Sequence, residues 1–274
     1  MPKTSYSFII PLFLVFLLVQ CTGLYLGYNQ MLAMQEENIE PLEDSSYGAG
    51  IIAILLIETA LILLVIKYLK SALKLMRVIA FILLSVFVVA FFELLLYTII
   101  PEPLPTIIGG VAAIVILSSA LLKKNWIANN LLMFTAVIFA GSASGALLGF
   151  YPVLVFAILI TIYDYIAVFK TKHMVTLAKA VIQEKIPATI TIPTKDHTYN
   201  LGNGDLFVPM TLSVSVMREL GLTASLFTLF GSCLGMAGIF LYLATREKKP
   251  LPALPPIMAG SMLGLLAYLI MIMI

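Results

Sequence analysis

Charged residues are scarce in this sequence. Only 11% of its 274 residues are Asp, Glu, Lys or Arg, whereas 61% are hydrophobic and the mean hydropathy is +1.08. A typical soluble domain carries about 25% charged residues, so this composition excludes that class. The chain has apolar runs of about 20 residues, the length of a membrane-spanning helix, and lacks the short alternating segments of a β-barrel.

Residue types that would support several other chemistries are also rare. The only histidines, His173 and His197, lie outside the apolar runs, and there is no HExxH motif, which excludes a zinc peptidase or a Ser–His pair within the membrane. Cys21 and Cys233 lie inside apolar runs without CxxC spacing, so we interpret them as small buried residues. No basic block suggests nucleic acid. We therefore expect no metal, no organic cofactor and no nucleic-acid partner.

The apolar runs predict an all-α polytopic membrane protein with nine transmembrane helices in a single membrane domain, 1–274. The expected spans are 6–28, 49–66, 78–100, 105–122, 127–148, 152–170, 205–220, 222–243 and 252–273. Residues 1–170 hold six of these spans, 171–204 form a loop, and 205–274 hold the last three. Within the loop we expect an amphipathic surface helix at 174–182 and a β-branched strand at 188–194.

Basic residues segregate to one side of this arrangement. With nine spans, 15 of the 16 lysines and arginines fall on one face, and only Arg218 falls on the other, together with an acidic loop at 36–44. Because basic loops stay in the cytoplasm, we expect a cytoplasmic N-terminus and an external C-terminus.

Glycines spaced four residues apart mark three of the expected spans. Such spacing predicts seams where helices pack closely. The glycines are Gly141, Gly145 and Gly149, then Gly231 and Gly235, then Gly260 and Gly264.

Four carboxylates lie within or at the edge of expected spans: Glu58, Glu93, Asp164 and Asp205. Each costs about 3 kcal/mol to insert into lipid, so each needs a partner, water or a function. For Glu58 and Glu93 we favour structural roles as interior hydrogen-bond partners, with a lining of a water path as the alternative.

Asp164 and Asp205 are predicted to lie at the same depth. Counting from Pro152, Asp164 lies about 18 Å below the outer surface; counting back from Leu220, Asp205 lies about 22 Å below it. Consecutive antiparallel spans are often neighbours, so we expect the two side chains to face each other. A simpler alternative is that Asp205 only caps a helix start. Gly202 and Gly204 are expected to give unusual backbone conformations and to let another chain approach.

Two adjacent carboxylates have a defined chemistry. They share a proton, so one can activate water as a base while the other donates to a carbonyl oxygen as an acid. This arrangement hydrolyses peptide bonds without a covalent intermediate.

Three motifs of the chain resemble those of a known family. "YD" at Tyr163–Asp164, "GNGD" at Gly202–Asp205 and "PAL" at Pro252–Leu254 match, in order, the motifs of the presenilin and signal peptide peptidase family of intramembrane aspartyl proteases. "TKHM" at Thr171–Met174 is similar to the compact archaeal members.

This resemblance implies catalytic roles for Asp164 and Asp205, and transmembrane or signal-peptide helices as substrates in a prokaryotic, archaeal-type cell membrane. It also implies a set of site-shaping and substrate-binding residues: Tyr163, Gly202, Gly204, Pro252, Ala253 and Leu254. The loop at 171–204 is short, which predicts activity as a single chain without an accessory subunit; homo-oligomers remain open.

A substrate helix must unwind before cleavage, and its freed backbone needs partners. We expect 188–194 and the proline-bounded 250–256 to offer strand edges, prolines keeping the latter out of a helix; an ordinary turn is the alternative for 250–256. Three rivals to the protease remain at this point. They are a proton- or cation-coupled transporter using the same carboxylates, a prepilin-type peptidase (disfavoured by the YD and PAL motifs) and a membrane scaffold.

Overall fold

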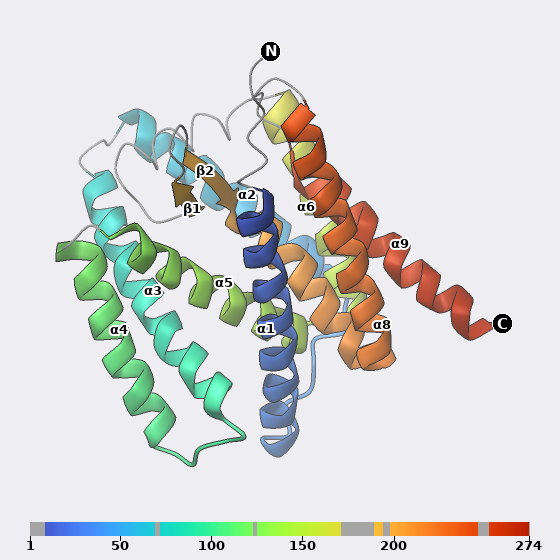
Figure 1. Ribbon diagram of the computed structural model, residues 1–274, viewed down its shortest axis with the longest axis horizontal. Helices are drawn as coiled ribbons and strands as arrows, with labels where there is room; N and C mark the ends of the chain where they lie inside the picture. Colours follow the sequence, from blue (N-terminus) through green and yellow to red (C-terminus); the bar gives the residue numbers. More distant parts are fainter. Residues whose placement is uncertain are drawn as a thin grey trace.

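The structure is a computed structural model that describes residues 9–68, 72–122, 125–170, 189–193, 198–245 and 252–273. These ranges form eight long helices and one two-stranded sheet (Figure 1). The helices are α1 (Ile9–Glu36), α2 (Ser46–Tyr68), α3 (Ala72–Leu96), α4 (Leu104–Leu122), α5 (Trp126–Leu147), α6 (Phe150–Phe169), α8 (Asn203–Thr245) and α9 (Leu254–Met273), and the strands are β1 (Thr189–Pro193) and β2 (Thr198–Gly202). All eight helices are long and apolar enough to cross a membrane, which confirms the predicted all-α membrane class.

Helix α8 replaces two of the nine expected spans. Its 43 residues would measure about 65 Å if straight, twice the thickness of a bilayer core. Gly221 interrupts it with φ 87° and ψ 173°, a conformation that is open to glycine and closed to other residues. The two arms of α8 thus correspond to the expected spans 205–220 and 222–243, while the number of crossings and their orientation stay predictions.

The interior is built around α5 and the first arm of α8. Every residue of α8 from Val208 to Met217 is buried, so this arm lies in the core on all sides. Helix α5 packs against α1, α3, α4 and α8, and α8 in turn packs against α1, α5, α6 and α9. Figure 1 shows the α3–α4 hairpin on one side of α5, with α6 and α9 on the far side of α8.

The predicted glycine seams are confirmed except at Gly149, which precedes α6 and packs against Glu43 of the acidic loop. A Cβ atom at Gly145 would lie 2.6 Å from the Thr211 carbonyl oxygen of α8, and one at Gly231 would collide with the Gly260 carbonyl of α9. Helix α1 contributes a further pair, Gly23 and Gly27, which pack against Met210 and Val214 and were not predicted. Glycine on both flanks therefore lets α1 and α5 approach the first arm of α8 closely.

The arginine that departs from the charge pattern is neutralised. Arg218, near the end of the first arm of α8, pairs with Glu43 at 2.5 Å and donates to the Ala146 carbonyl at 2.7 Å. Glu43 belongs to the acidic loop that the sequence placed on the same side as Arg218, so these segments share one end of the bundle.

The strand expected at 188–194 is present as β1. It pairs antiparallel with β2, with Thr191 opposite Asn200 and Thr189 opposite Gly202, and β2 leads directly into α8. The amphipathic helix expected at 174–182 lies outside the described residues.

Candidate active site

The structure brings Asp164 and Asp205 together. Asp164 lies on α6 and Asp205 in the first turn of α8, and their carboxyl groups are close enough for the charges to interact. The two helices pack against each other, and Phe156 meets Phe207 edge to face at 6.2 Å between ring centroids. Both aspartates are half-buried, and Oδ2 of Asp164 is fully buried without a hydrogen-bond partner among the described residues.

Asp205 also has a structural contact at the helix start. Its carboxyl group accepts a hydrogen bond from the backbone N–H of Gly202, the residue immediately before α8. A side chain at the third helical position that bonds back to the capping residue is one half of a capping box. The simple capping interpretation is therefore correct in part, and this bond holds the Asp205 carboxyl group at the helix start, where its charge interacts with that of Asp164.

The expectation of unusual backbone conformations at Gly202 and Gly204 is wrong. Among the described glycines, only Gly221 has a positive φ. Residue 202 needs glycine because there is no room for a side chain: a Cβ atom at Gly202 would lie 2.9 Å from Oδ2 of Asp205. At Gly204 a Cβ atom would meet nothing within 4 Å, so that exposed position leaves room beside the site.

Substituting Gly202→Ala is expected to lower activity without unfolding the protein. The new methyl group displaces the end of the Asp205 side chain, which can rotate, so the structural cost is small while the carboxyl group leaves its place. Because misplacement by about 1 Å can cost about 100-fold in rate, we expect kcat to fall about 10- to 100-fold. Thermal melting in detergent should stay near wild type. Gly204→Ala is the matched control, and equal losses in the two variants would contradict this explanation.

The start of α9 supplies a donor to Asp164. The backbone N–H of Leu254, whose side chain is 3% exposed, bonds to the Asp164 carboxyl group. The first N–H groups of a helix have no partner within it, and the following Pro255 and Pro256 have no N–H to offer. The prediction that prolines keep 250–256 out of a helix is wrong for Leu254–Pro256, because proline is well tolerated in a first helical turn.

The remaining predicted residues lie near this centre or away from it. Tyr163 is half-buried on α6 beside Asp164, and Pro252 and Ala253 are half-buried just before α9. Glu93 accepts a hydrogen bond from Thr106 at 2.7 Å, which joins α3 to α4 and fits its predicted structural role. Glu58 is exposed on α2, so an interior role for it is wrong, because its helix turns this residue toward the surface.

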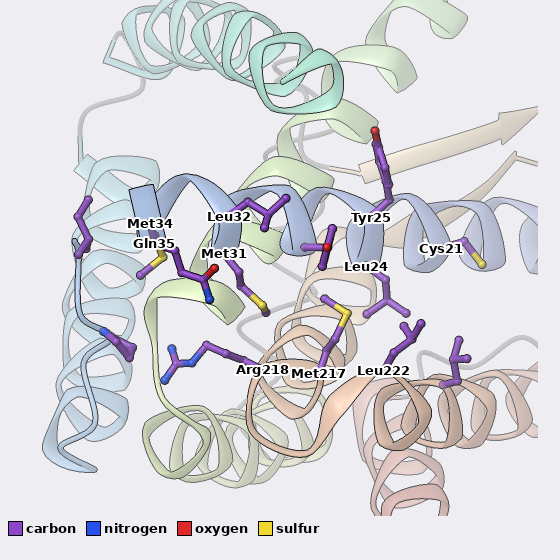
Figure 2. Close-up of a pocket in the computed structure, with 14 residues that line it drawn as sticks. Cys21, Leu24, Tyr25, Met31, Leu32, Met34, Gln35, Met217, Arg218 and Leu222 are labelled. Atoms are coloured by element: carbon purple, nitrogen blue, oxygen red, sulfur yellow. The ribbon is translucent and has the colours of Figure 1, made fainter. Parts of the chain in front are cut away.

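A cavity of about 940 Å³ lies elsewhere, between α1 and the part of α8 near Gly221 (Figure 2). Its walls include Leu24, Met217 and Leu222, with Arg218 at one side, and neither aspartate lines it. Arg218 is about 20 Å along α8 from Asp205, so this cavity is separate from the paired carboxylates.

Comparison with known proteins bears directly on these motifs. Residues 13–274 match the family model described as signal-peptide peptidase, presenilin aspartyl protease. The chain belongs to this family. It is an intramembrane aspartyl protease and a multi-pass integral membrane protein.

Solved structures of presenilin-family proteases have the same fold. A presenilin family intramembrane aspartate protease solved in space group C222 superimposes with a TM-score of 0.72 at 22% identity, covering 96% of this chain and 99% of the other. Another, solved in space group P2, gives a TM-score of 0.64 at 24% identity, covering 92% and 96%. A comparison with curated proteins gave no match.

Two polar residues of the protease escaped the sequence analysis. Gln20 of α1 is fully buried and donates to the Leu206 carbonyl at 3.0 Å, next to Asp205. Asn130 of α5 holds the β1 backbone with two bonds, accepting from the Thr191 N–H at 2.9 Å and donating to the Thr191 carbonyl at 2.7 Å. In the sequence, each of these residues could have been noticed only as an amide side chain inside an apolar run.

Proposed function

We propose that Asp164 and Asp205 are the catalytic pair of this intramembrane aspartyl protease. The observation that supports this most is that their carboxyl groups lie close enough for the charges to interact, and that each accepts one backbone N–H, from Leu254 and from Gly202. Opposed carboxylates in a partly buried site share one proton, so one is a base and the other an acid at the same pH. The mechanism does not depend on which of the two aspartates carries the proton.

The proposed reaction is a single addition followed by elimination. The ionised carboxylate takes a proton from water, whose oxygen forms a bond to the peptide carbonyl carbon, while the protonated carboxyl group donates to the carbonyl oxygen. The tetrahedral species then collapses: the carbon–nitrogen bond breaks, and the nitrogen leaves as an amine after receiving a proton from the pair. No group outside the two aspartates and water is required.

We infer from the hydrogen bonds of the sheet where an unwound substrate binds. A strand residue directs its N–H and C=O to the same side, and Asn130 occupies both groups of Thr191, so these point away from β2. Asn200, opposite Thr191, therefore directs its own backbone groups away from β1. The outer edge of β1 is thus occupied by Asn130. The outer edge of β2 leads along the chain to Asp205.

We therefore assign the substrate strand to the outer edge of β2 and not to β1, which departs from the expectation that 188–194 would offer that edge. Backbone pairing gives affinity with little dependence on substrate side chains. It also extends the scissile segment toward the aspartates, because β2 leads into α8 three residues before Asp205.

Asn200→Pro is expected to weaken substrate pairing. Proline removes the outward N–H and is tolerated in an edge strand where that N–H faces outward. Loss of one hydrogen bond, about 0.5 to 1.5 kcal/mol, predicts up to about a tenfold lower kcat/KM. Cleavage kinetics with a helical peptide would measure it. Asn200→Ala keeps the N–H and serves as the control; normal turnover by the proline variant would exclude this edge.

The finer topology is also part of the proposal. We place the N-terminus in the cytoplasm and the C-terminus outside, with nine crossings once the two arms of α8 are counted separately. The sheet end of the bundle then faces the cytoplasm, where cleavage occurs. The substrates are transmembrane or signal-peptide helices, one chain suffices for activity, and an archaeal-type cell membrane is the expected location.

Reconstitution of the purified chain in vesicles tests the proposed function. We expect a helical membrane peptide to yield two fragments whose masses sum to that of the peptide plus one water. A proton- or cation-coupled transporter would instead carry ions and leave the peptide intact, so ion flux is measured in the same vesicles. Bound but uncut peptide would indicate a scaffold.

A further inference from the structure

We propose that Gln20 of α1 is a positioning residue for the catalytic pair. Its side chain is fully buried, and its amide nitrogen donates to the carbonyl oxygen of Leu206 at 3.0 Å. Leu206 directly follows Asp205, so this bond ties α1 to the helical turn that carries the aspartate. The inference rests on the proposed roles of Asp164 and Asp205.

That turn of α8 is weakened by its own sequence. Pro209 has no N–H, so the carbonyl of Asp205, four residues earlier, lacks the hydrogen bond that a helix normally provides from that position. A lateral bond from another helix therefore has more influence here than it would in an uninterrupted helix. Gln20 supplies such a bond one residue after the aspartate.

Packing fixes the direction of the Gln20 side chain. Gly23 and Gly27 follow Gln20 by three and seven residues, so all three lie on one face of α1. That face meets α8 at close range, since Cβ atoms at the two glycines would collide with Met210 and Val214. The glutamine thus reaches the α8 backbone from a rigid base, and it holds the Asp205 carboxyl group at its place opposite Asp164.

Asn29 provides a matched control on the same helix. It is also fully buried, and its amide donates to a backbone carbonyl, that of Leu94 in α3, at 2.8 Å. Both amides leave their side-chain oxygen without a partner among the described residues. Each side chain therefore makes one buried amide-to-carbonyl bond to a neighbouring helix, and the two differ in whether the acceptor adjoins the proposed catalytic pair.

The experiment compares Gln20→Met with Asn29→Leu in the reconstituted full chain. We expect similar shifts in melting temperature for both. For Gln20→Met we expect kcat to fall about 10- to 100-fold with KM within about twofold, because the substrate site is intact while the carboxyl group is displaced. Asn29→Leu should keep kcat within about twofold.

Two further variants complete the test. Gln20→Asn keeps the amide but is one methylene too short to reach Leu206, so it should lose kcat as Gln20→Met does, and it serves if the methionine variant does not fold. Adding Pro209→Ala to Gln20→Met restores an N–H for the Asp205 carbonyl and should recover most of the lost kcat.

Wild-type kcat in both Gln20 variants, or parallel kcat losses at Gln20 and Asn29, would overturn the inference. Asp164→Asn in the same assay separates this failure from failure of the proposed function. If that variant cleaves normally, the assignment of the catalytic pair is wrong; if it is inactive while the Gln20 variants are normal, only the positioning role is wrong.

Discussion

Asp164→Asn and Asp205→Asn are each expected to abolish detectable peptide cleavage, with kcat reduced by about 10²- to 10⁴-fold. In the proposed mechanism, either substitution removes one of the two groups that exchange protons with water and the carbonyl oxygen. Both variants should fold, because an asparagine side-chain oxygen can still accept the N–H of Leu254 or Gly202. The measurement is fragment formation in the reconstituted system, with melting temperature recorded for each variant.

Glu93→Gln is the control for loss of a carboxylate inside the membrane region. Its side chain can still accept from Thr106, and it lies on α3, which carries neither Asp164 nor Asp205. We expect normal cleavage from it. A single aspartate variant that retains a tenth or more of wild-type activity would remove the basis for a two-carboxylate mechanism.

Gly231→Ala is expected to destabilise the protein by about 1 to 3 kcal/mol, the usual cost of overpacking. A Cβ atom there collides with the Gly260 carbonyl and lies 3.1 Å from the Cα of Gly264, both of them backbone atoms that cannot rotate away. Helices α8 and α9 must therefore separate. Since α9 begins with Leu254, which bonds to Asp164, activity should fall together with stability.

Gly238→Ala is the matched control in the same arm of α8. A Cβ atom at this position meets nothing within 4 Å, and alanine favours a helix over glycine by about 1 kcal/mol. We expect its melting temperature in detergent to equal or exceed that of wild type. If the two alanine variants have the same melting temperature, the close α8–α9 approach does not contribute to stability as proposed.

The class of the protein, most helix positions and the identity of the paired aspartates were predictable from the sequence. A bilayer demands long apolar runs, and an ionisable residue within such a run is costly, so both features are conspicuous. Glycine spacing predicted the α5–α8 and α8–α9 seams for the same reason, since only small residues allow helices to approach closely. The pairing of Arg218 with Glu43 likewise fits the charge pattern.

Other features were misjudged because they depend on what surrounds a residue. We expected Gly202 to adopt an unusual backbone conformation. The structure shows instead that the Asp205 side chain beside it leaves no room for a Cβ atom. Pro255 and Pro256 were taken as helix breakers, although at the start of α9 they leave Leu254 as the free donor. Glu58 was placed inside, and the rotation of α2 exposes it.

The sequence alone thus determined that this is a membrane-embedded protein with two acids on successive apolar segments, since apolar length and charge cost are local properties of the chain. Tertiary structure decided which backbone groups hold those acids: the N–H of Leu254, the N–H of Gly202 and the Gln20 amide that binds beside Asp205. Leu254 and Gln20 act across large sequence separations. Such contacts depend on how helices rotate and pack against one another, and no local pattern of residues records that.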